Sequence, residues 1–452
     1  MASKLLARQA VVFGAGMAGL AAARVLAECF ERVTVLERDT LPTDTSHRSG
    51  TPQSKHVHAL AGGGQRALSD LFPGVEHDLA RAGAVPLRVD LDVRVETPRH
   101  DTFPRRDFGW NTYSMSRPLI ELVVRRRVEQ QANVRLCPRC RAQTLEATPD
   151  GSAVTAVRFE NSDGRSERLS ADLVIDASGR GSLTLGLLET VGLPPPEETV
   201  IGVDIGYASA IFAIPGDFSG DWKGVLTFAQ VPQHSRGGLM VALEGNCWIV
   251  SLGGRHADKP PGDPDGFLAY AQQLRTPTIY DAIRRAERLG DIARFGFPAS
   301  VWRHFERIEA FPRGLLPIGD AICRFNPVYG QGMSVAAQEA VLLRRLLLSL
   351  EEETDPLAQL APAFFAEACG LIETPWASAA IPDFVFPETK GERPPDFEST
   401  REFGAALNLL AARDAHVHKL IVEVQHLLKP RSVLRKPDLL ERVRAVMAEA
   451  QE

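Results

Sequence analysis

The hydrophobic pattern of the chain opens with two apolar runs separated by a helical segment. Residues 10–13 form a short apolar run of the kind found in buried parallel strands. Small and apolar residues then recur at helical spacing as far as Leu26, and a second run at 33–36 predicts another strand. This order of strand, helix and strand predicts a parallel α/β unit at the start of the chain.

Three glycines at GxGxxG spacing occupy the first turn of this unit. Gly14 allows a tight turn, Gly16 lets the backbone approach a diphosphate, and Gly19 lets the helix touch the strand. The helix begins near Met17 and Ala18, where unpaired N–H groups and the positive end of the helix dipole favour phosphate. These five residues are therefore candidate cofactor contacts.

An acidic residue, Glu37, ends the second strand about 20 residues beyond the glycine turn. An acid at this position accepts hydrogen bonds from the hydroxyls of an adenosine ribose, and Arg38 beside it is a further candidate contact. Because a carboxylate disfavours a 2′-phosphate, the unit predicts a site for FAD or NAD rather than NADP.

Strand patterns dominate the middle of the chain. Alternating apolar residues over 85–95 predict one half-buried antiparallel strand, and the pair 117–118, Arg followed by Pro, marks a helix start. Residues 133–176 predict a meander of strands that closes on a buried strand ending at Asp176. Residues 190–300 are mostly strand-like and predict a separate mixed or antiparallel sheet.

A second strong pattern lies between residues 314 and 350. An apolar run at 315–318 predicts a strand that ends just before Asp320. A turn-rich loop at 326–332 then leads into a long apolar helix that starts near Met333. Ligands bind at the carboxyl ends of strands in open α/β sheets, so Asp320 and this glycine-bracketed loop are expected to face a ligand.

Composition narrows the class of protein. The 452 residues carry a net charge of −6, which argues against nucleic acid as a partner. No apolar stretch reaches about 18 residues without a charge, so no transmembrane helix is expected. No secretory signal is expected from the first residues, and six cysteines fit a reducing cytoplasm. Cys137 and Cys140 form a lone CxxC; without a second pair we expect two structural thiols, rather than a redox pair or half a zinc site, and no metal centre.

A polar loop at residues 40–60 follows the ribose-binding acid, and long loops in compact domains are usually functional. It carries Arg48, His56 and His58. Alternation would place the two histidines on one face of an extended segment. They are candidates for positioning a substrate or relaying a proton, and structural histidines would give the same pattern. A metal site is disfavoured because no third ligand lies near them in the sequence.

In combination these motifs resemble the flavoprotein monooxygenases of the p-hydroxybenzoate hydroxylase type. The resemblance rests on the GxGxxG turn with its distal acid, the arginine at 117, the DASG strand end at 176–179, and GDA with NPVYGQGMS at 319–334. It covers roughly residues 8–350. The RSGTPQSKHVHAL and FNPVYGQGMSVAA segments are more similar to bacterial FAD-dependent olefin epoxidases of polyether biosynthesis and to squalene epoxidases. The WxWxIP signature of the related tryptophan halogenases is absent from the sequence.

The resemblance implies that the dinucleotide is FAD. The glycine turn and Glu37 would hold its diphosphate and its adenosine ribose. Arg48 and Arg117 would contact it, and Asp320 would hydrogen-bond its ribityl chain. Asp176 would support the site from its strand end. The isoalloxazine ring would face a set of residues around the start of the long helix: Pro327, Gly330, Gln331, Gly332 and Met333.

The fold class implied is α/β, with an FAD-binding Rossmann-like domain of discontinuous segments, an inserted β-sheet substrate domain and a helical C-terminal region. The FAD-binding domain would comprise residues 1–84, 114–189 and 301–352. The substrate domain would comprise residues 85–113 and 190–300, and the helical region residues 353–452.

The activity implied is that of a monooxygenase of secondary metabolism. It would insert one oxygen atom from O2 into a hydrophobic substrate through a flavin C4a-hydroperoxide, by epoxidation or hydroxylation. No acid–base pair is defined by spacing, which favours an alkene over a phenol. Electrons would come from NAD(P)H or from a separate flavin reductase. Two alternatives are open: a flavin reductase of isolated double bonds similar to geranylgeranyl reductases, and a non-catalytic flavin- or prenyl-binding protein.

Overall fold

A five-stranded parallel sheet carries the N-terminal glycine turn. The computed structural model describes residues 5–449 and places the strands of this sheet in the order β16-β10-β1-β2-β6. All of its pairings are parallel, so strands from distant parts of the chain become neighbours. The strands are β1 (Ala7–Phe13), β2 (Phe30–Glu37), β6 (Val134–Pro138), β10 (Leu173–Asp176) and β16 (Leu315–Pro317).

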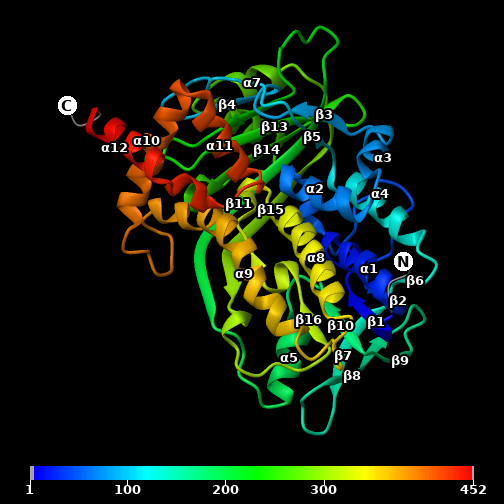
Figure 1. Ribbon diagram of the computed structural model, residues 1–452. Helices are drawn as coiled ribbons and strands as arrows, with labels where there is room; N and C mark the ends of the chain where they lie inside the picture. Colours follow the sequence, from blue (N-terminus) through cyan, green and yellow to red (C-terminus); the bar gives the residue numbers. More distant parts are fainter. Residues whose placement is uncertain (1–4, 450–452) are drawn as a thin grey trace.

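Both faces of this sheet are covered, as the continuous apolar run in β1 predicts. Ala10 and Val12 belong to the core under α1 and α8, which lie side by side in Figure 1. Val11 and Phe13 belong to the core under the antiparallel β7–β9 sheet and α5. The predicted meander therefore holds for β7–β9, whereas β6 joins the parallel sheet. These elements are α1 (Met17–Cys29), α5 (Ser182–Thr190), α8 (Gly332–Ser349), β7 (Arg141–Ala147), β8 (Val154–Glu160) and β9 (Ser166–Ser170).

A second sheet has seven strands in the order β17-β15-β11-β14-β13-β12-β4. Ala208, Phe212 and Trp248 face α6 and α7, which bury one side of it. Tyr207 and Ser209 alternate with these positions and point to the opposite side, where His56 lies. The elements are β11 (Glu198–Ala213), β12 (Gly224–Thr227), β13 (Gly237–Leu243), β14 (Cys247–Arg255), β15 (Arg288–Arg303), β17 (Cys323–Arg324), α6 (Pro264–Gln272) and α7 (Thr278–Ile283).

The prediction of a single antiparallel strand over residues 85–95 is wrong. The chain forms β3 (Val85–Arg88), which pairs with β5 (Asn111–Ser114), and β4 (Val93–Glu96), which pairs in parallel with β12. Between β3 and β4 the Asp92 carboxylate accepts hydrogen bonds from the backbone N–H and the guanidinium of Arg88. These bonds close a turn, and alternation cannot reveal it because Arg and Asp also suit the polar positions of a strand.

The C-terminal region is helical. α9 (Leu360–Ala379) packs beside α8, and Figure 1 shows the following helices beyond it. α10, α11 and α12 share a small apolar cluster that also includes Phe103. They span Phe397–Arg413, Ala415–Gln425 and Pro437–Glu449. No helix within residues 5–449 is long and apolar enough to cross a membrane.

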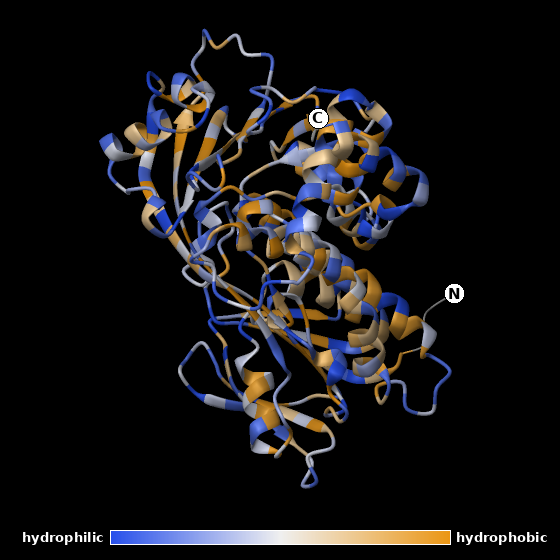
Figure 2. Ribbon diagram, turned by 90° about the vertical axis from the view of Figure 1, so that its left-hand side faces the viewer, coloured by the Kyte–Doolittle hydropathy of each residue, from blue (hydrophilic) through white to orange (hydrophobic). Residues whose placement is uncertain are grey.

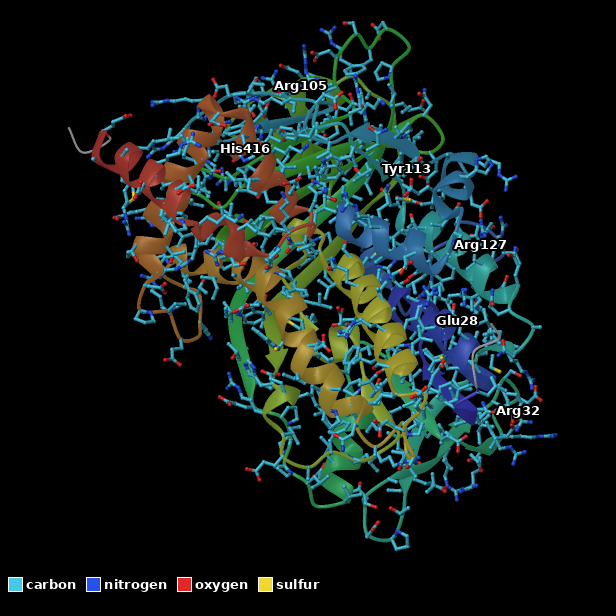
Figure 3. The ribbon with its side chains drawn as sticks, in the orientation of Figure 1. Glu28, Arg32, Arg105, Tyr113, Arg127 and His416 are labelled. Carbon is cyan, nitrogen blue, oxygen red and sulfur yellow. The ribbon has the colours of Figure 1, made fainter. Side chains whose placement is uncertain are left out.

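Three further helices complete the surface beside the parallel sheet: α2 (Gly62–Leu71), α3 (Val75–Arg81) and α4 (Arg117–Glu129). Arg127, labelled in Figure 3, joins α4 to α3 through an ion pair of 2.5 Å with Asp78. Figure 2 shows apolar residues concentrated on the strands and on the inward helix faces. The expected α/β fold class is confirmed: a parallel sheet built from distant segments, a second β-sheet and a helical C-terminal region.

Candidate functional site

The glycine turn between β1 and α1 has no room for side chains. Gly14 has a φ of +89°, and its N–H donates to the Leu36 carbonyl at 2.9 Å. A Cβ placed on Gly19 would lie 1.9 Å from the Gly14 carbonyl oxygen, so the helix approaches the strand end as closely as backbone allows. α1 begins after Gly16 without a side-chain cap. Its first N–H groups are therefore available to an anion such as a diphosphate.

A buried ion cluster lies behind this turn. Arg48 is 3.0 Å from Glu37 through one guanidinium nitrogen and 3.0 Å from Glu121 through the other. Arg117 donates to the second Glu121 oxygen at 2.6 and 2.9 Å. Glu37 also accepts from the backbone N–H of Ala15 at 2.7 Å, which ties the cluster to the glycine turn. The cluster thus joins three candidate residues that are far apart in the sequence.

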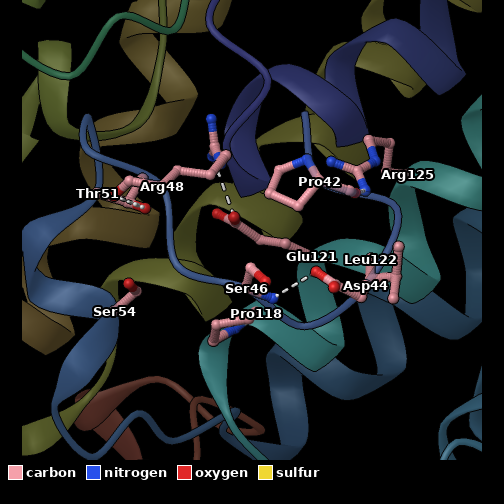
Figure 4. A pocket seen from close by; sticks show the side chains of 10 residues that line it. All are labelled: Pro42, Asp44, Ser46, Arg48, Thr51, Ser54, Pro118, Glu121, Leu122 and Arg125. Carbon is pink, nitrogen blue, oxygen red and sulfur yellow. Dashed lines mark hydrogen bonds and ion pairs between the residues drawn. The ribbon is translucent and has the colours of Figure 1, made fainter. Parts of the chain in front are cut away.

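Glu121 completes the cluster and was not predicted. Burial opposes its ionisation, but Arg117 and Arg48 outweigh burial and lower the pKa of its carboxyl, so it stays charged at neutral pH. Its position four residues after Arg117 on one helix is the signal that could have revealed it. A small pocket borders it (Figure 4), lined by Pro42, Asp44, Ser46, Arg48, Thr51, Ser54, Pro118, Glu121, Leu122 and Arg125.

The segment after β16 meets the glycine turn. A Cβ on Gly319, whose φ is +62°, would lie 3.1 Å from the Cβ of Ala18. A Cβ on Gly16 would lie 3.9 Å from a guanidinium nitrogen of Arg117, and one on Gly332 would lie 3.9 Å from Asp320 Oδ1. Two segments about 300 residues apart in the sequence, together with the start of α4, therefore line one region.

This region is recessed into the protein. The Asp320 side chain is exposed, yet desolvation by the surrounding protein raises its pKa, with Arg117 and Arg324 opposing the rise. Tyr329 is 38% exposed, and desolvation by the surrounding protein likewise raises its pKa. A group that is open to solvent and desolvated at the same time lies in a hollow rather than on a convex surface. Asp320 is thus a carboxylate that faces a hollow beside the uncapped start of α8.

The loop before α8 is held by the C-terminal region on one side and by the loop of residues 40–60 on the other. The Asn326 side chain accepts from the Val328 N–H at 3.0 Å and donates to Asp383 at 2.7 Å. Gly330 has a φ of +63°, and a Cβ there would lie 2.8 Å from the Cβ of Ala59. α8 then begins after Gln331 with no side-chain cap. The backbone at Gly330 is consequently packed against the histidine-bearing loop.

The two histidines of that loop diverge rather than sharing one face. His56 is 8% exposed, and its Nδ1 lies 2.7 Å from Ser209 Oγ on β11. His58 turns back so that its Nδ1 lies 2.9 Å from the His56 carbonyl oxygen, and it is near enough to Arg117 to feel its charge. Burial, which is the main cause, lowers the pKa of each to about 4. Both imidazoles are therefore neutral at physiological pH.

Two candidate residues lie apart from this region's surface. Asp176 is fully buried, and its carboxylate accepts from Ser178 and Thr184 hydroxyls at 2.6 and 2.7 Å. It therefore shapes the turn after β10, whose Ala177 carbonyl abuts Gly14. Arg38 is exposed at the end of β2.

Glu339 of α8 is a buried acid that was not predicted to act. One of its oxygens accepts from the Gly319 N–H at 2.6 Å, and the other has no partner among the described residues. Burial raises its pKa to about 7, and the charge of Asp320 adds to the rise. A single acid within an apolar helix was the available sequence signal.

The cysteines add no cluster to the site. Cys137 and Cys140 are free thiols, and burial raises the pKa of Cys137. Within residues 5–449 no group of three or more His, Cys, Asp or Glu side chains is arranged to hold a metal ion.

Both the sequence and the structure of the chain are similar to those of known proteins. The FAD binding domain family matches residues 8–360. Protein Rv3254 of Mycobacterium tuberculosis (strain ATCC 25618 / H37Rv) is 36% identical over 349 residues, which are 75% of this chain and 72% of that protein. The flavin-dependent brominase Bmp2 superposes with a TM-score of 0.68 at 16% identity, over 98% of this chain and 99% of the other. PqsL of Pseudomonas aeruginosa, a probable FAD-dependent monooxygenase, gives 0.59 at 15% identity, over 84% and 98%. These two structures share the fold.

Proposed function

Since this chain belongs to the FAD binding domain family, we propose that it is an FAD-dependent monooxygenase acting on a hydrophobic small molecule. The observation that carries the proposal is the meeting of the glycine turn, Arg117 and the Asp320–Met333 segment around one recessed region. Two helices that begin without side-chain caps, α1 and α8, both start there.

In this proposal the adenosine half of FAD lies at the glycine turn. The glycine turn at Gly14–Gly19 and the start of α1 hold the diphosphate. A larger residue at Gly19 would displace this turn, because its side chain would fill space that the backbone occupies. Glu37 accepts from the ribose, and Arg48 and Arg117 contact the cofactor. The buried ion cluster supports this role because it orients both guanidinium groups before any ligand arrives.

The flavin half lies at the second segment. Asp320 accepts from the ribityl hydroxyls, and Pro327 and the backbone of Gly330–Met333 face the ring. The N–H groups at the start of α8 stabilise negative charge on the ring edge, an effect of about 0.3–2 kcal/mol. FAD supplies the two-electron chemistry and the activation of O2 that side chains cannot provide.

The protein's own residues position the substrate and exclude water. Tyr207, Phe295 and the start of α8 bound the region on the side of the seven-stranded sheet. His56 and His58 are weak bases because burial lowers the pKa of each to about 4. Weak bases suit epoxidation of an alkene, which needs no deprotonation, better than hydroxylation of a phenol. We therefore favour an olefin epoxidase of secondary metabolism.

The remaining parts of the proposal concern electrons and organisation. NAD(P)H, or a separate flavin reductase, supplies the electrons. Residues 1–84, 114–189 and 301–352 hold FAD, residues 85–113 and 190–300 form the substrate side, and residues 353–452 brace the loop before α8.

The test uses purified full-length protein loaded with FAD and reduced by NADPH or by an added flavin reductase. With a panel of alkenes under labelled O2, we expect a product that gains one 18O atom and oxygen uptake that depends on the alkene. A gain of two hydrogens without oxygen would instead identify a double-bond reductase. Covalently bound bromine or chlorine in the product of a parallel reaction supplied with the halide would identify a halogenase, and flavin that no electron donor reduces would identify a binding protein.

A further inference from the structure

A series of hydrogen bonds crosses the face of the seven-stranded sheet that is turned away from α6 and α7. It starts at the backbone N–H of Val57, which donates to Ser251 Oγ at 3.0 Å. Ser251 Oγ lies 2.5 Å from Ser209 Oγ, and Ser209 Oγ lies 2.7 Å from His56 Nδ1. The two serines are cross-strand partners on β14 and β11, so both hydroxyls point to the same face.

The donor-to-acceptor direction along this series of hydrogen bonds follows from its first bond, from Val57 to Ser251. A backbone N–H can only donate, so Ser251 Oγ accepts from Val57. Among the described residues the other hydrogen-bond partner of the Ser251 hydroxyl is Ser209, so its proton goes there. Ser209 then gives its own proton to Nδ1 of His56. The reverse direction would leave the Ser251 proton without an acceptor among the described residues. The neutral imidazole therefore carries its hydrogen on Nε2.

The Nε2–H end of His56 is buried and has no hydrogen-bond partner among the described residues. The rings of Phe295 and Tyr207 lie 5.7 and 6.3 Å from the imidazole, and both are only half-buried. Tyr207 in turn contacts Asn326 at 3.3 Å, in the loop that leads to α8. Burial, with a smaller effect of Lys55, lowers the pKa of His56 to about 4, so this donor stays neutral. A buried N–H without an acceptor is costly, which indicates that a ligand atom supplies one.

We propose that His56 Nε2–H donates a hydrogen bond to a neutral oxygen of the substrate, such as a ketone, ester or amide carbonyl, and that Ser209 and Ser251 set this polarity as positioning residues. The proposal rests on the proposed function, because it deepens the substrate class of the same site. The rings of Phe295 and Tyr207 beside the imidazole suit the hydrocarbon part of such a molecule. A substrate with an ammonium group at this position would not bind, because His56 Nε2–H and the ammonium group are both hydrogen-bond donors.

The first test reads the tautomer directly. Full-length FAD-loaded protein labelled with 15N-histidine is compared with His56→Gln protein, whose missing signals identify His56. We expect a protonated Nε2 and an unprotonated Nδ1. In Ser251→Ala protein, Ser209 is free to accept, and we expect the His56 proton to shift toward Nδ1. The exposed Ser166→Ala variant on β9 serves as the control and leaves the His56 signals unchanged. A proton on Nδ1 in the unmodified protein would overturn the proposal.

The second test measures ligand preference with a matched pair of probes, 4-phenyl-2-butanone and butylbenzene, through the absorption change of bound FAD. The ketone should bind about five- to tenfold more tightly than the hydrocarbon, which is the effect of one neutral hydrogen bond. This ratio should fall to about one in His56→Leu and in Ser251→Ala, and His56→Gln, which keeps a donor, should restore part of it. No saturable binding of the ketone, or an equal ratio in His56→Leu, would refute the proposal. Neither test needs turnover, so failure of the monooxygenase assay leaves both readable.

Discussion

At Gly19 the neighbouring backbone leaves no space for a side chain, and at Glu339 burial disfavours the charged form of the carboxyl group. Both residues lie on helices that pack against the ends of parallel strands: Gly19 abuts the turn after β1, and Glu339 accepts from the Gly319 N–H after β16. One added carbon atom changes the packing at Gly19, and one proton changes the charge at Glu339. Substitutions at these positions should therefore have measurable effects.

Gly19→Ala should abolish most FAD binding. The new Cβ would lie 1.9 Å from the Gly14 carbonyl oxygen, so the glycine turn must move. We expect the ratio of flavin to protein absorbance to fall several-fold and the protein to lose roughly 2 kcal/mol or more of stability. Gly186→Ala is the matched control, because a Cβ there meets no atom within 4 Å in the middle of α5. It should keep its FAD and gain up to about 1 kcal/mol.

Glu339→Gln should remove a pH dependence of stability. Burial raises the pKa of Glu339 from 4.5 to about 7, so its contribution to stability is full below 4.5 and is lost as the pH rises through about 7. Glutamine is neutral at every pH and its oxygen still accepts from Gly319. The stability of the variant relative to the unmodified protein should therefore increase by about 3 kcal/mol between about pH 5 and about pH 8. A difference that does not vary with pH in chemical denaturation would contradict this.

At the scale of elements, the loop before α8 is anchored by a helix turn from the C-terminal region. Asp383 in the turn Ile381–Val385 is 1% exposed and receives hydrogen bonds from Asn326 and from Arg255 of β14. One carboxylate thus joins the second sheet, the loop and the C-terminal region. Arg255 also stacks its guanidinium 4.9 Å from the ring centre of Phe386. The position of the loop is therefore set by chain that lies beyond α8.

Asp383→Asn should loosen this loop. An amide cannot accept from both partners and puts a donor against one of them, so a buried arginine loses its counter-charge. We expect a loss of roughly 3 kcal/mol in chemical denaturation and weaker FAD retention on gel filtration. Asp101→Asn is the control, because Asp101 pairs with Arg275 but its side chain is 85% exposed. It should cost less than about 1 kcal/mol. Equal effects of the two variants would contradict the assignment.

At the scale of the whole molecule, neutral histidines lie at the junctions between its parts. His56 joins the loop of residues 40–60 to the second sheet. His426 joins the C-terminal region to α2, because its Nδ1 accepts from the Gly62 N–H at 3.1 Å and its carbonyl accepts from the Gly63 N–H at 2.7 Å. Protonation of either ring would place a donor where an acceptor is needed.

The protein should therefore lose stability steeply in mild acid. Burial lowers the pKa of His56, His58 and His426 from 6.5 to about 4. Their contribution is present above pH 6.5 and is lost as the pH falls through about 4, by up to about 3 kcal/mol per residue. Thermal melting between pH 7 and pH 4 should show this decline, and His426→Gln should make it shallower. A variant curve parallel to that of the unmodified protein would argue against a neutral His426.

The sequence alone predicted those features that depend on residues close together along the chain. Continuous apolar runs, the GxGxxG turn and the acid at the end of β2 each depend on neighbours a few residues away, so they predicted the parallel strands, α1 and the α/β class. The same reasoning failed for β3 and β4, since a carboxylate that closes a turn looks like any polar strand position. It also placed His56 and His58 on one face, whereas separate partners turn them apart.

Only the tertiary structure decided which distant residues meet. Ser209 and Ser251 occupy ordinary positions on alternating strands, and Asp383 lies in an unremarkable stretch of the C-terminal region. Their neighbours are set by strand order and by register, in which a shift of one residue would turn every side chain to the other face. Burial, too, belongs to the folded molecule, because the desolvation that keeps His56 neutral comes from side chains that the local sequence does not contain.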